Sequence, residues 1–149
     1  MLPAFDSDVA WEIGTIIRTR CQKHNRPAIV YIAHASSSQL LFFATSRPGT
    51  HPDNMQWVKR KEAAVLKLGM SSLRMRLKSM RPAPDEEYLG DLMHDMVDPS
   101  VYKCHGGGFP VRVRNVEGIV GVIAVSGLRS EDDHGVIVDG IREYLARNK

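Results

Sequence analysis

The densest cluster of chemically capable residues in the chain is Cys104-His-Gly-Gly-Gly-Phe-Pro110. Its three consecutive glycines, Gly106, Gly107 and Gly108, allow the backbone to take positive φ angles and to approach another group closely. Such a loop can direct several N–H groups at an anion, and His105 beside it offers a titratable ring or a metal ligand. The alternative is a tight bend at the start of a strand, with His105 satisfied by hydrogen bonds.

Several enzyme classes are excluded by missing motifs. His-Gly-Gly-Gly also occurs as an oxyanion loop in lipases and esterases, but the chain has no Gly-x-Ser-x-Gly elbow and its glycine run comes late. The phosphate-binding patterns Gly-x-x-x-x-Gly-Lys and Gly-x-Gly-x-x-Gly are also absent. The histidines and cysteines form no His-x-x-x-His or Cys-x-x-Cys pair, so a dedicated structural zinc site is not expected.

A second group of polar and aromatic residues lies in Asp53-Asn-Met-Gln-Trp-Val-Lys-Arg-Lys61. Helical spacing places Asn54, Trp57 and Lys61 on one face, with Arg60 one position aside. This face is a candidate ligand site, although a Trp on an amphipathic helix is more often a core residue.

A third group, Ser130-Glu-Asp-Asp133 followed by His134, resembles a loose capping box that opens the last helix. Acids at a helix start complement the helix dipole, so capping and solubility are the simpler roles for them. His134 is a further candidate ligand-binding residue.

Length and composition favour an ordinary globular protein. Of 149 residues, 43% are hydrophobic and 25% charged, which is enough apolar material for one core, and we expect one domain over residues 1–149. The apolar runs are far shorter than the ~20 residues that span a bilayer. The N-terminus lacks a basic region followed by an apolar stretch, so we predict a cytoplasmic protein with Cys21 and Cys104 as free thiols.

Charge is distributed unevenly along the chain. The net charge of +3 is too small to argue for nucleic acid. Residues 59–81 nevertheless carry eight basic residues and one acid, whereas residues 85–98 carry six acids and no Lys or Arg. The two blocks can neutralise each other within the fold or between copies, and we favour this over a phosphate-binding surface.

Hydrophobic periodicity predicts the elements that must position these groups. Helices are expected at residues 8–24, from residue 53 past 68, at 85–96 and from Ser130 onward, with strands at 28–33, 39–45, 109–114 and 119–125. Residues 71–80 form either a short helix or an irregular continuation, and 101–104 a short strand. Because hairpins join the strands, we predict an α+β layer with helices on a mainly antiparallel sheet.

Together the motifs resemble one family. Asp53-Asn-x-x-Trp-x-x-Arg-Lys61, Ser71-Ser72, His105-Gly-Gly-Gly-Phe-Pro110 and Val125-Ser-Gly-Leu-x-x-Glu-Asp-Asp-His134 occur in the order and approximate spacing of the haem-degrading-domain (GlcG/HbpS-like) family. The similarity runs from the first helix to the last and is closest to a branch of small stand-alone proteins of unassigned function.

The resemblance implies a profilin-like fold and a homo-oligomer larger than a dimer. Some relatives bind haem or ferric iron, so haem or iron is the cofactor that the family suggests. Haem chemistry here would need an iron ligand, most simply His105 with His134 as the second choice, and a cation such as Arg60 for the propionates. Membership of a family predicts a shared fold more securely than a shared activity, so we assign no reaction to this chain. Two hypotheses follow: a protein that binds haem, iron or a small carboxylate near residues 105–108 and 54–60, or a non-catalytic oligomeric adaptor.

Overall fold

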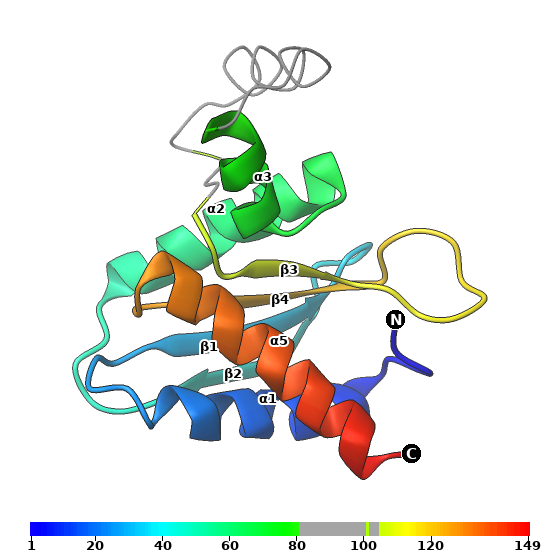
Figure 1. Ribbon diagram of the computed structural model, residues 1–149, viewed down its shortest axis with the longest axis horizontal. Helices are drawn as coiled ribbons and strands as arrows, with labels where there is room; N and C mark the ends of the chain where they lie inside the picture. The colour runs from blue at the N-terminus through cyan, green and yellow to red at the C-terminus, as the bar shows by residue number, and fades with distance from the viewer. Residues whose placement is uncertain (81–100, 102–104) are drawn as a thin grey trace.

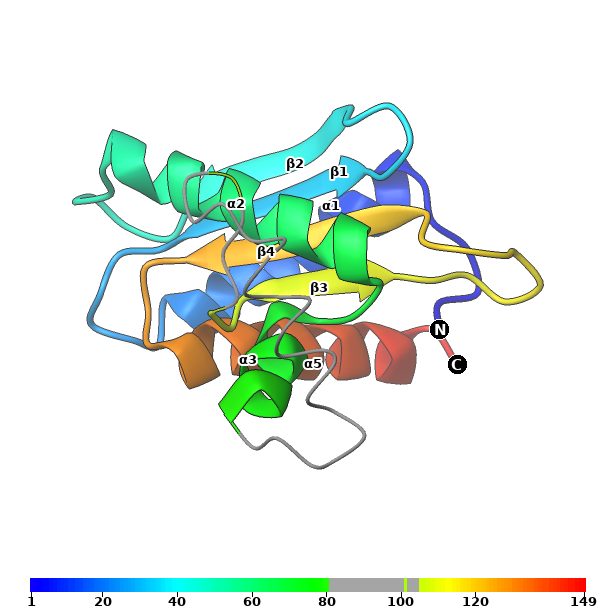
Figure 2. The same ribbon diagram turned by 90° about the horizontal axis from the view of Figure 1, so that it is seen from above.

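The computed structural model describes residues 1–80, 101 and 105–149 (Figure 1). Within them, four strands form one antiparallel sheet in the order β2 (Leu40–Thr45), β1 (Ile29–His34), β4 (Gly121–Ser126) and β3 (Gly108–Val111). Helices α1 (Ser7–Cys21) and α5 (Ser130–Arg147) cover one face, and α2 (Pro52–Leu68) covers part of the other (Figure 2). The predicted α+β class, with an antiparallel sheet flanked by helices, is confirmed.

The two central strands are buried because helices pack on both of their faces. Val30 and Ile32 of β1 join the core beneath α1 and α5, whereas Tyr31 between them joins Val58 of α2 on the opposite face. This alternation follows from the period of two along a strand. Strand β4 is buried along its whole length, and α2 packs against it.

Most elements lie where the periodicity predicts them. Residues 71–80, for which two interpretations were open, contain helix α3 (Ser72–Met80). Strand β3 is shorter than predicted because backbone groups of Arg112 and Arg114 bond to Leu2 near the N-terminus instead. Val101 lies in a turn, while the predicted acidic helix at 85–96 and residues 102–104 of the predicted strand lie outside the described residues. No helix in the described ranges is long and apolar enough to cross a membrane.

The glycine loop (residues 105–108) is held from two sides before it enters β3. The Gly106 N–H donates to Ser130 Oγ of α5 (2.7 Å), and the Gly108 N–H donates to Ser72 Oγ of α3 (2.8 Å). Gly107 has a φ of +113°, and a Cβ there would lie 2.4 Å from the Val125 carbonyl oxygen and 2.8 Å from Lys61 Nζ. Glycine is therefore required at this position both by backbone conformation and by space.

We predict that Gly107→Val lowers the free energy of unfolding by about 2–6 kcal/mol, since a strained φ of about 1–3 kcal/mol adds to a steric clash of similar size. Urea denaturation measures the effect. Gly118→Val is the matched control, because Gly118 also has a positive φ, +87°, but nothing lies within 4 Å of its Cβ position. Lys149→Ala should leave the free energy of unfolding unchanged. Equal losses at Gly107 and Gly118 would contradict the packing argument.

Candidate functional site

A cavity of about 290 Å³ lies where the first half of α2, the glycine loop and the turn from β4 into α5 meet. Helix α2 contributes Asn54, Trp57 and Lys61 to its lining. The glycine loop contributes His105 and Gly106. The remaining wall consists of residues 126–128 with Ser130 and Asp133 from the start of α5, and Arg26 from the segment before β1.

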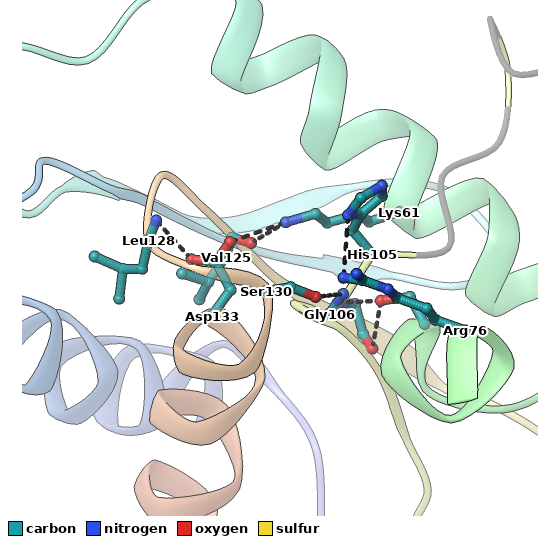
Figure 3. Close-up of polar contacts among 10 residues, drawn as sticks. Lys61, Arg76, His105, Gly106, Val125, Leu128, Ser130 and Asp133 are labelled. Atoms are coloured by element: carbon teal, nitrogen blue, oxygen red, sulfur yellow. Dashed lines mark hydrogen bonds and ion pairs between the residues drawn. The ribbon is translucent and has the colours of Figure 1, made fainter. Parts of the chain in front are cut away.

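The deepest charged groups of the cavity form an ion pair (Figure 3). Lys61 Nζ donates to Asp133 Oδ2 at 3.2 Å and to the Val125 carbonyl oxygen at 2.8 Å. The two side chains are only 5% and 4% exposed. Burial lowers the pKa of Lys61 and raises the pKa of Asp133, while each charge favours the ionised form of the other.

The predicted capping box of Ser130 and Asp133 at the start of α5 is wrong. Helix α5 is preceded by Arg129 as its N-cap, and that residue makes no side-chain capping hydrogen bond. The Asp133 carboxylate turns back instead, and its Oδ1 accepts the Leu128 N–H at 2.9 Å. Ser130 is likewise engaged by the Gly106 N–H. Both side chains therefore fix the turn and the glycine loop rather than capping the helix in the predicted way.

Asn54 and Trp57 have different roles within α2. Asn54 Oδ1 accepts the His51 N–H at 2.9 Å, which completes the start of the helix. Trp57 forms a flat wall of the cavity, and the Arg60 guanidinium lies 5.1 Å from its ring centroid. Arg60 itself lines a neighbouring groove with Met55. The cation–π contact holds Arg60 on the Trp57 ring, and Arg60 is not among the residues that line the cavity.

His105 lies beside α3, where its Nδ1 is 3.4 Å from Arg76 Nη1. Because a guanidinium has no acceptor, Nδ1 accepts in this contact and the proton of a neutral ring lies on Nε2. A metal-ligating histidine ordinarily donates its second ring N–H to an acceptor, which Arg76 cannot be. Among the described residues, no group of three or more His, Cys, Asp or Glu side chains could hold a metal ion.

His134 does not line the cavity. Its ring lies 6.0 Å from the Phe109 ring, and its Nδ1 is buried without a hydrogen-bond partner among the described residues. Burial lowers the pKa of this histidine. Gly107 and Gly108 also lie outside the lining, packed against Lys61 and α2.

The structure thus brings four of the predicted site residues to one cavity, namely Asn54, Trp57, His105 and Gly106. Sequence reasoning missed Arg26, Ser126 and Asp133, and placed Lys61 on the right face without assigning it to a site. The signal for Lys61 was available: a lysine sharing its helix face with Ala64 and Val65 needs a buried acid as partner. No motif or periodic pattern in the sequence around Arg26 identifies it as a site residue.

We predict that Lys61→Met lowers the free energy of unfolding by about 3–5 kcal/mol, because it leaves Asp133 buried without its cation. Chemical denaturation measures this change. The control is Arg142→Ala, which removes an exposed pair with Asp139 and should cost less than about 1 kcal/mol. A loss for Lys61→Met as small as that of the control would mean that Asp133 does not depend on the lysine.

Comparison with known proteins gives consistent matches. The family model described as haem degrading protein HbpS-like matches residues 5–142. The UPF0303 protein mlr5144 of Mesorhizobium japonicum is 40% identical over 149 residues, which are 100% of this chain and 84% of that protein.

Solved structures agree with these sequence matches. The crystal structure of Ybr137w protein has a TM-score of 0.83 at 25% identity and covers 99% of this chain and 83% of that one. A PduOC:heme complex has a TM-score of 0.70 at 15% identity, over 93% of this chain and 94% of that one, and shares the fold. The chain belongs to the family of HbpS-like haem degrading proteins.

Proposed function

We propose that the cavity binds a small monoanionic carboxylate. The observation that carries the proposal is the charge of the lining: Lys61 and Asp133 neutralise each other, whereas Arg26 is exposed and has no hydrogen-bond or ion-pair partner among the described residues. One positive charge is therefore left to the ligand. A guanidinium matches a carboxylate in geometry and can bind both of its oxygens.

Further polar groups of the lining suit a ligand with an additional oxygen. The Ser126 hydroxyl and the Asn54 amide N–H₂ have no hydrogen-bond partner among the described residues. The Trp57 ring supplies an apolar wall for the carbon skeleton. A short hydroxy or oxo acid would use all of these contacts.

Haem does not fit this lining. The wall contains buried charges where a macrocycle needs an apolar slot, and Arg76 opposes iron ligation by His105. Iron ligation by His105 stays a prediction of the family resemblance.

Calorimetric titration with lactate tests the proposal. We expect the wild-type chain to bind it, and Arg26→Ala to weaken binding about 10- to 100-fold, since a hydrogen bond to a charged group contributes about 1.5–3 kcal/mol. Arg142→Ala, on the outer side of α5, should bind like wild type. Unchanged binding in Arg26→Ala would contradict the proposal.

A parallel titration with haem tests haem as the alternative ligand. A stoichiometric Soret band in the wild type that is lost in His105→Ala would favour haem over a carboxylate. Failure of both lactate and haem to bind would leave the adaptor hypothesis.

A homo-oligomer larger than a dimer is also part of this proposal. The exposed apolar side chains of the described residues include Leu40 (51%) and Phe43 (46%) on β2, and Trp11 (66%) on α1. Among the described elements, α2 contacts β1, β3 and β4 but not β2, which leaves the side of Phe43 that faces away from α1 uncovered. Exposed apolar groups of this kind support protein–protein contact, and two such surfaces allow an assembly beyond a dimer.

Multi-angle light scattering tests the assembly. We expect Phe43→Ser and Trp11→Ser each to reduce the measured mass, whereas Lys149→Ala should not. Apolar contacts should persist in 1 M salt, where ion pairs are screened within about 3 Å. Dissociation by salt alone would show instead that the charge blocks hold the copies together, and a wild-type monomer would remove the proposal.

A further inference from the structure

We propose that Lys61 forms a reversible imine with the carbonyl carbon of a small 2-oxo acid in the cavity. The inference rests on the proposed carboxylate site and adds to it the class of ligand and a covalent step. It starts from Lys61, which is one of the residues that line the cavity although almost all of its side chain is buried.

The Lys61 amine is directed toward the ligand space by fixed partners. Of its three N–H groups, one is taken by the Val125 carbonyl oxygen and one by Asp133 Oδ2, and the described residues offer no third partner. The absent Cβ of Gly107 leaves the room that the nitrogen occupies, since an atom there would lie 2.8 Å away. The third position on nitrogen is therefore left for a ligand in the cavity that Lys61 lines.

Asp133 is placed to move the proton that imine formation requires. Its Oδ2 takes one proton from the ammonium, and the free amine turns about its Cε–Nζ bond so that the lone pair faces the ligand. The lone pair then attacks the carbonyl carbon, which forms the C–N bond as the C=O π bond breaks. A proton passes from nitrogen to the former carbonyl oxygen, giving a carbinolamine. Asp133 then returns its proton to the hydroxyl, the C–O bond breaks, and water leaves. The products are a protonated imine and one water molecule, with no change in oxidation state.

The residues around the Lys61 nitrogen would stabilise the positive charge of the protonated imine. The protonated imine keeps its positive charge beside the Asp133 carboxylate, which the Leu128 N–H holds in place. Burial, which lowers the pKa of Lys61 and raises the pKa of Asp133, also assists the proton transfer. Arg26 at the same cavity holds the carboxylate next to the reacting carbonyl.

Lys59, two positions earlier on α2, is the internal comparison. Its ammonium donates to Tyr31 Oη at 2.8 Å and pairs with Glu62 at 3.6 Å, and its side chain is half-exposed. The hydrogen bond with Tyr31 raises the pKa of Lys59, which keeps it protonated. A reagent that labelled lysines by exposure alone would therefore react with Lys59 rather than with Lys61.

Reductive trapping tests the inference on the wild-type chain. Pyruvate with cyanoborohydride at neutral pH should add one carboxyethyl group to Lys61, located by peptide mapping, at a rate at least roughly tenfold above that of Lys59 because the bound carbonyl is held next to the amine. Lactate, which has a hydroxyl where pyruvate has its keto group and therefore cannot form an imine, should compete for the site and suppress the labelling. Lys61→Arg, which keeps the cation, should abolish it.

The outcomes separate the two proposals. Binding of lactate and pyruvate without labelling of Lys61, or labelling that follows exposure at Lys59, overturns the imine and leaves the carboxylate site standing. Absence of binding by both acids overturns the two together. If Lys61→Arg does not fold, the wild-type peptide map and its suppression by lactate still decide the question.

Discussion

The ion pair between Lys61 and Asp133 connects the parts of the chain on which the cavity depends. Lys61 comes from the middle of α2, and its ammonium also binds the carbonyl oxygen of Val125 near the end of β4. Asp133 comes from the first turn of α5 and holds the backbone of Leu128. One buried interaction therefore fixes the distance between α2 and α5 across the end of the sheet, and the cavity is the space that remains beside it.

The glycine loop packs directly against this ion pair, and Gly107 leaves the space that the pair occupies. A side chain at Gly107 would meet the Val125 carbonyl, the Lys61 ammonium and the Asp133 Cβ within 3 Å. Ser72 and Ser130 hold the loop from opposite sides through the amides of its neighbours. The glycines thus serve close packing against a charged pair. They do not form an open anion nest in this structure, because two of their amides already bond to protein hydroxyl groups.

Local sequence patterns predicted the elements well and the site only in part. The spacing of Asn54, Trp57 and Lys61 specifies one helix face, so their common position on the cavity follows from the period of the helix. The role of Asp133 does not follow, because an acid in a first helical turn satisfies local capping rules and its partner is 72 residues away in the sequence. His134 was grouped with it by adjacency, yet one residue turns a helix by about 100°, which carries the ring to Phe109. Arg26 lies in a connecting segment without any periodic signal.

A buried ion pair is an unusual choice if stability is its only purpose. Well-packed apolar residues of similar volume often stabilise a core as well or better, because two charges lose their hydration on burial. Apolar residues at positions 61 and 133 would, however, leave the Val125 carbonyl oxygen and the Leu128 N–H without these partners, and would turn the inner wall of the cavity into hydrocarbon. The charged pair keeps a proton donor and a proton acceptor next to each other among the residues that line the cavity. In physical terms, this arrangement is better suited to chemistry on a polar ligand than to packing.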